Sequence, residues 1–276
     1  MELTWKKIRA VYFSPTGTTK KVITTIADCI GMELKLPVEA YDFTLPHVRK
    51  EGIVFGADEI VVFGIPTYAG RIPNVLLKYL ATVKADGSLA VPVALYGNRN
   101  FDDSLIELRN LLEENGFHTV AGAAFIGEHS FSKVLGKNRP DEKDMMIVGS
   151  FAKKAAEKIS QITDVSALTP VEVKGETPIR TYYQPRDRKG NPIDIRKVLP
   201  KTKPSCINCG ICADVCPMGS ISKENVSELT GICIKCGACS KACPVGAKYY
   251  DDEGYLYHKE ELELGYERRA EPELFL

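Results

Sequence analysis

The sequence has no long apolar run and no excess of charge of either sign. No eighteen consecutive apolar residues occur in its 276 positions, so we expect no transmembrane helix and no membrane partner. The N-terminal stretch MELTWKKIRA lacks an apolar core of signal-peptide length, so we expect a cytoplasmic protein. Lysine and arginine together number 36, as do aspartate and glutamate, and this balance argues against nucleic acid as a partner.

Two nucleotide-binding motifs are also absent. No G-x-G-x-x-G turn occurs, so the sequence does not support direct use of NAD(P)H. No G-x-x-x-x-G-K-[S/T] loop occurs either, which excludes the phosphate loop of nucleoside triphosphatases. The hydrophobic content of 44% is nevertheless enough for a sizeable core, and the length suggests one to two domains.

Cysteine is nearly absent outside one segment, because Cys29 is the only cysteine among the first 205 residues. The other eight lie within 38 residues, as CINCGICADVCP and then CIKCGACSKACP. Both copies have the spacing C-x2-C-x2-C-x3-C-P, which holds two [4Fe-4S] clusters, with the fourth cysteine of each copy binding the other cluster. We therefore predict two ligand sets, one of Cys206, Cys209, Cys212 and Cys243, the other of Cys216, Cys233, Cys236 and Cys239.

Structural zinc and disulfides are the alternatives for this segment. Zinc sites usually pair two C-x2-C units across a longer gap, and a tetrahedral site needs neither the third cysteine nor the Cys-Pro ending. Disulfides are disfavoured because no secretory signal marks the chain for an oxidising compartment. Iron-sulfur clusters are therefore the favoured interpretation.

The first 163 residues alternate between short β-branched or aromatic runs and segments with the apolar spacing of helices. Strands are expected at 9–13, 39–44, 59–66, 91–97 and 119–126, and helices at 20–30, 73–83, 104–115 and 141–162. Pro73 suits the first turn of its helix, and Asn115-Gly116 suits the end of the next one. This alternation predicts a doubly wound parallel α/β sheet that binds ligands at the carboxyl ends of its strands.

Three polar loops follow strands and would meet at that edge of the sheet. The first, SPTGTT (14–19), leads directly into a helix, whose free N–H groups and dipole favour an anion such as a phosphate. An ordinary Ser/Thr helix cap is the alternative for this hexapeptide. The loops PTYAGRIP (66–73) and YGNRNFDD (96–103) each add an aromatic side chain, a glycine and exposed backbone groups, which suit a flat ring attached to a phosphate.

The motif S-x-T-G-T-T and the two later loops resemble those of flavodoxin, which binds FMN through the same three loops. This resemblance covers about residues 7–162 and implies a five-stranded parallel sheet of order 2-1-3-4-5. The whole chain resembles a family of fused flavodoxin and ferredoxin proteins of anaerobes, in which YGNR, GEHS and the paired cysteine motif occur in this order. The ferredoxin part of the resemblance covers about residues 203–248.

The resemblance implies a set of FMN-binding residues in the three loops. The phosphate would be held by Ser14, Thr16, Gly17, Thr18 and Thr19. The isoalloxazine ring would lie between Tyr68 and Phe101, and its polar edge would face Thr67, Ala69, Gly70, Gly97 and Asn98, with Pro66, Arg71, Tyr96, Arg99 and Asp103 completing the loops. Flavodoxins often have a tryptophan here, but the only one in this chain, Trp5, precedes the first strand.

Charge and proton transfer near the ring provide two further hypotheses. Arg71 and Arg99 replace the acidic cluster that commonly surrounds the flavin, and a positive charge there would raise the flavin potential. His129, in the GEHS segment, is a candidate proton donor together with Arg71, although a surface or capping histidine is the commoner role.

The chain is expected to have four parts. These are a flavodoxin-like FMN domain (1–163), a proline-rich ordered linker (164–202), a small α+β ferredoxin domain with two clusters (203–250) and an acidic C-terminal tail (251–276) that either covers part of the cluster domain or frays. Residues 170–250 carry 13 basic and seven acidic residues. This excess either balances the negative clusters or forms a docking face for an acidic redox partner.

Joining an FMN site to two clusters predicts an electron-transfer flavo-iron-sulfur protein, a redox carrier or reductase of anaerobic metabolism. One alternative is a flavin-dependent reductase of a small substrate, such as a quinone or an activated organic molecule, with Tyr68, Arg71, Arg99 or His129 lining its pocket. The other is a non-catalytic redox-sensing module. The sequence identifies no particular redox partner protein and leaves a homodimer open.

Overall fold

The computed structural model describes residues 5–276. Its main sheet contains five parallel strands, β1 (Lys7–Tyr12), β2 (Val38–Asp42), β4 (Glu59–Pro66), β6 (Leu89–Tyr96) and β8 (Gly122–Ile126), in the order β2-β1-β4-β6-β8. Numbered along the chain, this is the 2-1-3-4-5 order of flavodoxin-like folds, which confirms the predicted doubly wound sheet. No helix within residues 5–276 combines the length and apolar character needed to span a bilayer.

The central strands are buried on both faces, as their sequences indicate. Every residue of β6, LAVPVALY, is buried, and so are the first seven residues of β4. Such continuous apolar runs are typical of parallel strands that are covered by helices on both sides. At the edge of the sheet, β2 has only exposed and partly exposed residues because a single strand flanks it.

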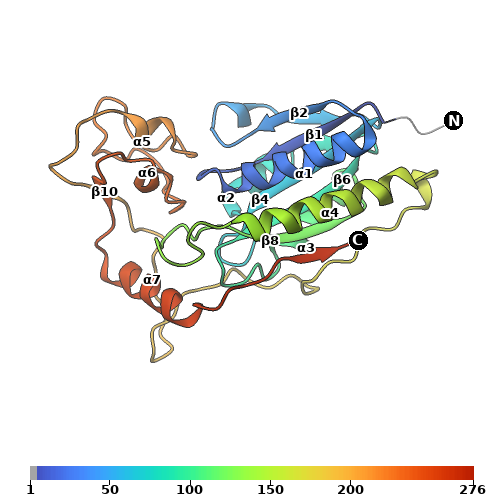
Figure 1. Cartoon of the computed structure of the whole chain (residues 1–276). Helices are drawn as coiled ribbons and strands as arrows, with labels where there is room; N and C mark the ends of the chain where they lie inside the picture. Colours follow the sequence, from blue (N-terminus) through green and yellow to red (C-terminus); the bar gives the residue numbers. More distant parts are fainter. Residues whose placement is uncertain (1–4) are drawn as a thin grey trace.

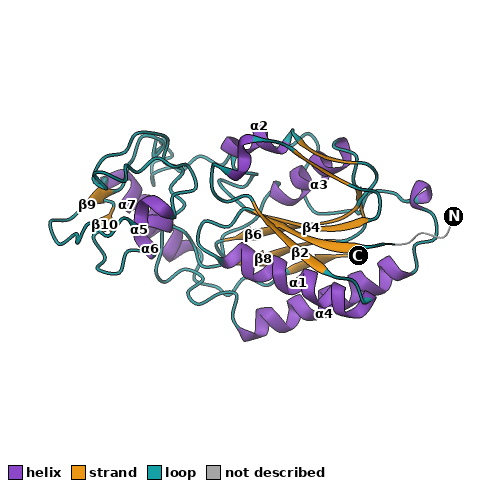
Figure 2. Cartoon of the chain, turned by 90° about the horizontal axis from the view of Figure 1, so that it is seen from above, coloured by secondary structure: helices purple, strands orange, loops and turns teal. Residues whose placement is uncertain are grey.

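Two long helices cover one face of the sheet and two shorter ones cover the other (Figure 2). The first pair is α1 (Thr18–Leu34) and α4 (Glu142–Ser160), and the second is α2 (Asn74–Leu80) and α3 (Ser104–Glu114). The apolar residues of α1 recur every three or four positions and pack with those of α4 in one core. This core holds the loop before α1 at the carboxyl ends of the strands.

Short elements complete the first half of the chain. They are η1 (Val48–Lys50), β3 (Ile53–Phe55), which pairs with β5 (Val83–Ala85), β7 (His118–Thr119), which pairs with β6, and η2 (Val165–Ala167). Helix α2 is shorter than the predicted 73–83 because the chain enters β5 at Val83. The predicted strand 119–126 is divided into β7 and β8.

The cysteine segment lies at the end of the sheet where the parallel strands terminate (Figure 1). It comprises β9 (Lys201–Thr202), α5 (Ile211–Asp214), α6 (Ala238–Lys241) and β10 (Lys248–Tyr249), with β10 antiparallel to β9. We call residues 201–250 the iron-sulfur lobe. The segment before it runs back along the first domain, where the Tyr183 amide donates to the carbonyl of Ala69 over 2.8 Å.

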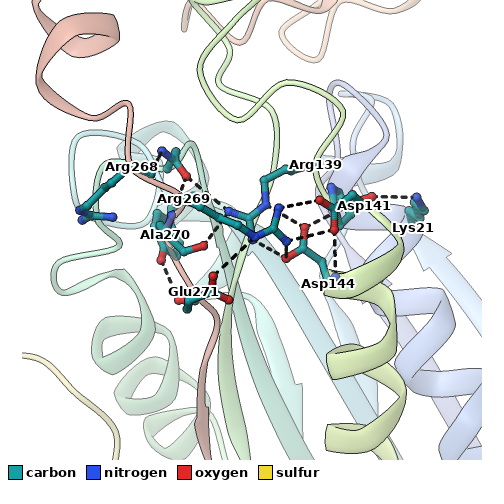
Figure 3. A network of polar contacts seen from close by, with 11 residues as sticks. Lys21, Arg139, Asp141, Asp144, Arg268, Arg269, Ala270 and Glu271 are labelled. Atoms are coloured by element: carbon teal, nitrogen blue, oxygen red, sulfur yellow. Dashed lines mark hydrogen bonds and ion pairs between the residues drawn. The ribbon is translucent and has the colours of Figure 1, made fainter.

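The last residues return from the iron-sulfur lobe to the main sheet, which the sequence did not predict. Helix α7 (Glu253–Gly265) follows the lobe, and β11 (Glu273–Phe275) then pairs antiparallel with β8. Figure 3 shows the contacts that hold the intervening residues. Arg139 donates to the Ala270 carbonyl over 2.6 Å and to Asp144, and Arg269 pairs with the helix cap Asp141 at 2.6 Å. The first strand, β1, and the last, β11, thus belong to one sheet.

Candidate redox site

The eight clustered cysteines line two separate cavities in the iron-sulfur lobe. We call one the outer cavity, lined by Cys206, Cys209, Cys212 and Cys243, and the other the inner cavity, lined by Cys216, Cys233, Cys236 and Cys239. The fourth cysteine of each copy therefore lies with the first three of the other copy. This grouping is the crossed arrangement that the spacing predicts for two cubane clusters.

The two copies have the same irregular backbone. At an interval of 27 residues, Asn208 and Lys235 both adopt φ of 53°, and each is followed two residues later by a glycine with positive φ. In the first turn the Asn208 N–H donates to Cys206 Sγ at 3.4 Å. After the fourth cysteine of each copy, the N–H of Ser220 donates to Cys216 Sγ at 3.4 Å and that of Ala247 to Cys243 Sγ at 3.1 Å. Amide donors of this kind stabilise thiolate ligands.

Burial governs the protonation of the inner cysteines. It raises the pKa of Cys236 to about 12 and that of Cys239 to about 11, so as free side chains both would stay protonated at neutral pH. A bound metal centre supplies the positive charge that makes the thiolate form favourable. The four cysteines that line each cavity match the ligand number of a cubane cluster.

The predicted phosphate cradle is open and rich in donors. Gly17 has φ of 86°, and the space where its Cβ would lie is empty to 4 Å. The Ser14 hydroxyl accepts from the Lys20 amide at 2.9 Å, whereas the amides of Thr18 and Thr19, at the start of α1, have no hydrogen-bond partner within residues 5–276. No acidic side chain stands in the first turn of α1. These features fit the phosphate of FMN.

The loop after β4 turns sharply beside the inner cavity. Tyr68 and Arg71 exchange backbone hydrogen bonds of 2.9 and 3.1 Å, and Ala69 and Gly70 both have positive φ. Burial, together with the nearby sulfurs of Cys236 and Cys233, raises the pKa of Tyr68 well above its usual value. The predicted ring-contacting tyrosine therefore lies next to the inner ligand set.

Several residues predicted to face the ring are committed elsewhere. Phe101 is only 1% exposed and packs on Tyr96 at 5.6 Å between ring centres. We therefore correct the prediction that Phe101 stacks on the flavin ring, because its side chain has no exposed face. The Arg71 guanidinium is paired with Glu107 at 2.6 Å. The Asp103 carboxylate is fully buried and accepts from the amide and side chain of Arg180. Contacts within the chain thus occupy side chains that the loop sequences suggest are free to contact a flavin.

The Asn98 side chain is also committed, because its amide donates to the carbonyls of Tyr266 and Arg268 over 2.7 Å each. Pro66, Thr67, Tyr68, Gly97 and Arg99 remain partly exposed, and Ala69 is exposed. These residues, with the backbone of Gly70 and Asn98, are the part of the predicted ring site that the structure keeps together at one edge.

Tyr183 joins this edge from the linker, which sequence reasoning missed. Its amide is bonded to Ala69, and the Arg99 guanidinium lies 4.4 Å from the centre of its ring. Tyr183 is 38% exposed, and its ring also lies 6.0 Å from that of His258, centre to centre. The adjacent pair Tyr182-Tyr183 in an otherwise proline-rich and charged segment was the only sequence signal for this contact.

His129 packs against the backbone of Gly97 and is held in a neutral form. Burial, with the positive charges of His258, Lys241 and Arg99 nearby, lowers the His129 pKa to about 3. Its Nδ1 accepts from the Phe131 amide at 3.1 Å, which leaves the proton on Nε2. At neutral pH His129 can therefore donate a hydrogen bond from Nε2. It is not suited to act as a proton donor, because with so low a pKa the imidazolium form would be largely deprotonated.

The inner side of the lobe is in close contact with the first domain. Lys241 of α6 donates to Glu128 at 2.6 Å and to the His129 carbonyl at 3.1 Å. Arg49 donates to the Pro217 carbonyl at 2.5 Å and to the Phe43 carbonyl at 2.7 Å. The two halves of the predicted redox site are therefore joined by direct contacts on both sides of the inner cavity.

Comparison with known proteins identifies the cysteine segment. Residues 205–247 match the family described as the 4Fe-4S dicluster domain. Similar solved structures include a flavodoxin from the domain Archaea (17% identity, TM-score 0.40, 56% of this chain and 99% of that one) and a flavodoxin of Streptococcus pneumonia TIGR4 (18%, 0.39, 55% and 98%). Another is oxidised Flavodoxin 2 from Bacillus cereus (20%, 0.38, 55% and 99%). No curated protein matches the chain.

Strand order and cysteine spacing together define a two-part architecture of the kind used for electron transfer. This chain consists of a flavodoxin-like α/β domain and a 4Fe-4S dicluster domain at residues 205–247. The fold assignment of the first part rests on the order and direction of its strands.

Proposed function

We propose that this protein transfers electrons between two [4Fe-4S] clusters and FMN, as a redox carrier or reductase in a reducing compartment such as the cytoplasm. The observation that supports the proposal is the close approach of the inner cysteine segment to the first domain. A Cβ on Gly237 would meet the carbonyl of Ser130, in the loop after β8, at 2.6 Å, and the sulfurs of Cys236 and Cys233 lie near enough to Tyr68 to raise its pKa. When bound, clusters exchange single electrons, and FMN exchanges one or two.

The residues around the inner cavity would fix the distance between the two cofactor sites. Cys236, Cys239, Cys233 and Cys216 would hold one cluster, and the cradle of Ser14, Thr16, Gly17, Thr18 and Thr19 would hold the flavin phosphate. Lys241 and Arg49 tie the lobe to the first domain, so the sites would keep one separation without a moving linker. A rigid arrangement suits electron transfer, which requires no large motion at each step.

The surroundings of the ring site favour a carrier over a reductase of a small substrate. A reductase needs an open pocket above the ring, whereas Tyr183 and the chain after Tyr266 lie against the loop residues Ala69 and Asn98. The groups proposed to line such a pocket are also engaged, because Arg71 is paired with Glu107 and His129 packs on Gly97.

Anaerobic cofactor analysis followed by a transfer assay tests this function. Purified protein should contain about eight iron atoms, about eight sulfides and one FMN per chain. When the clusters are reduced photochemically, the flavin absorbance should bleach at a rate that does not depend on protein concentration. Zinc in place of iron, or a chain that binds no flavin, would refute the corresponding half of the proposal. A rate that rises with protein concentration would show that transfer within one chain does not occur.

A further inference from the structure

The two copies of the cysteine motif have equivalent residues in very different surroundings. Because the second copy follows the first at an interval of 27 residues, each position around one cavity has a counterpart around the other. The inner positions are Ile234, Gly237, Ala238, Lys241, Met218 and Gly219. Their outer counterparts, in the same order, are Ile207, Gly210, Ile211, Asp214, Val245 and Gly246. We call the second set the outer face.

The glycines show that the first domain covers only the inner positions. A Cβ on Gly237 would lie 2.6 Å from the Ser130 carbonyl, and one on Gly219 would lie 3.2 Å from Pro46. At the counterparts Gly210 and Gly246, a Cβ would have no neighbour within 4 Å. All four have positive φ, so the same backbone is closely covered around the inner cavity and bare around the outer one.

The apolar residues show the same contrast. Ile234 packs against the core of the first domain, and Ala238 is 3% exposed. Their counterparts Ile207 and Ile211 are 62% and 38% exposed, and Val245 is 43% exposed. All three line the outer cavity together with Cys209, which is itself exposed. Large apolar side chains gathered at one exposed site usually mark an interaction surface.

The charges indicate what would complement this surface. In the inner copy Lys241 pairs with the acidic Glu128, whereas the equivalent outer residue is acidic, Asp214. Among residues 5–276, Asp214 is paired only with Lys223, at 2.7 Å and with both side chains more than half exposed, so the pair is weak and easily exchanged. Lys248, which also lines the outer cavity, is buried and donates to Thr202 and Val226.

We propose that the outer face docks a separate redox protein whose contact surface is apolar and carries a basic residue opposite Asp214. This inference rests on the proposed electron-transfer function. The partner would bring a backbone loop over Gly210, as the first domain brings Ser130 over Gly237, and so reach the outer cysteine set closely. The partner is thus basic at this contact, unlike the acidic one suggested by the excess of lysine and arginine over residues 170–250.

Oxidised cytochrome c, a small haem protein with lysines around its haem edge, is a suitable probe. Holoprotein with reduced clusters, freed of excess reductant, is mixed with the probe, and haem reduction is followed under anaerobic conditions. The serine variant carries both Ile207→Ser and Val245→Ser. It should reduce cytochrome c with a second-order rate about tenfold lower than the wild type, because each serine removes apolar contact area. Asp214→Lys should slow the rate about threefold at low salt, and this difference should vanish at high salt.

Matched controls carry the same substitutions away from the outer face. Met32→Ser replaces a 71% exposed residue near the end of α1, and Asp28→Lys reverses an exposed charge on the same helix. Both should reduce the probe at the wild-type rate. Asp214 does not line the outer cavity, so with the small acceptor dichlorophenolindophenol, and in iron content and cluster-to-flavin transfer, Asp214→Lys should match the wild type. Because Ile207 and Val245 do line that cavity, the rate of the serine variant is expressed per intact outer cluster, counted from its iron content.

Three results would overturn the inference. The first is an equal rate for the wild type and the serine variant with cytochrome c, and the second is an equal slowing by Met32→Ser. The third is a dimer, detected by sedimentation at rising concentration, that the serine variant abolishes, since the occupant of the outer face would then be a second copy of this chain. A wild-type protein without clusters or without flavin bleaching would instead refute the proposed function, so the two failures are distinguishable.

Discussion

A Cβ atom on Gly237 would lie 2.6 Å from the carbonyl oxygen of Ser130, so the iron-sulfur lobe and the loop after β8 are in backbone contact. Gly237 begins helix α6 with φ of 74°, and Lys241 in the last turn of that helix pairs with Glu128 of the same loop. One short helix is thus fixed at both ends to the domain that would carry the flavin. Four predictions follow from this arrangement and from the site around it.

The first prediction compares two glycine substitutions. Gly237→Ala and Gly210→Ala each place a side chain on a left-handed residue, at a cost of about 1–2 kcal/mol in the free energy of unfolding. Only Gly237→Ala also displaces Ser130, so it should slow cluster-to-flavin transfer severalfold and expose the domain contact to protease. Stopped-flow flavin bleaching and limited proteolysis measure both effects. Equal transfer rates in the two variants would contradict the role of this contact.

The second prediction concerns the crossed cysteines. Cys243→Ser should remove the outer cluster and Cys216→Ser the inner one, each lowering the iron content from about eight to about four. Flavin bleaching after photochemical reduction should persist in Cys243→Ser, because the inner set borders Tyr68, and should be lost in Cys216→Ser. The reverse pattern would show that each motif binds its own four ligands.

The third prediction separates the two arginines of the ring-site loops. Both arginines are ion-paired, Arg71 with Glu107 and Arg99 with Asp102. Arg99 also lies over Tyr183 at the exposed edge, so Arg99→Gln, which leaves the Asp102 carboxylate there without its partner, should lower the two-electron potential of the flavin. Arg71→Gln should cost about 3 kcal/mol in stability, since Glu107 would remain buried without its partner. Redox titration and chemical denaturation measure these values. A wild-type potential below that of free FMN would contradict the proposed effect of Arg99.

The fourth prediction is a pH dependence of stability. In the folded protein the pKa of His129 is lowered to about 3 and that of His258 to about 4, mainly by burial, whereas an unfolded histidine titrates near about 6.5. The unfolded chain therefore binds more protons below this value, and stability should fall as the pH drops from about 6.5, by up to about 1.4 kcal/mol per pH unit for each histidine. His129→Gln should flatten this slope between pH 6.5 and 5. Denaturant midpoints across this window are the measurement, and an unchanged slope would contradict the neutral, buried state of His129.

Local patterns predicted much of the fold because the forces behind them act over short distances. The runs EIVVFGIP and LAVPVALY indicate buried parallel strands, since every position must face a covering helix. The repeated cysteine spacing likewise specifies the turns that bring three sulfurs together, because the glycines that allow left-handed backbone lie at the same offsets in both copies. The C-terminal strand β11 was not predicted, because the three residues ELF are too few to show a strand pattern. They form a strand because they pair with the edge of β8.

The ring site was predicted less completely. In the sequence, Phe101 and Tyr183 are both aromatic residues of irregular segments, and nothing local distinguishes their burial. In the structure, Phe101 is buried against Tyr96 and Tyr183 is exposed beside Ala69. Likewise, Arg99 pairs with Asp102 of its own loop, whereas the partner of Arg71 is Glu107, which lies 36 positions further along the chain. Burial and pairing are properties of residues distant along the chain, so the loop sequences alone do not contain them.

The sequence by itself predicted two kinds of cofactor site, because ligand type and spacing follow from a few consecutive residues. The tertiary structure alone decided how the two cysteine sets differ. It placed Gly237 under Ser130 and left Gly210 uncovered, although both glycines occupy the same position in the repeat. The physical reason is that coverage depends on which side of the lobe packs against the flavodoxin-like domain, and identical local motifs do not encode that choice.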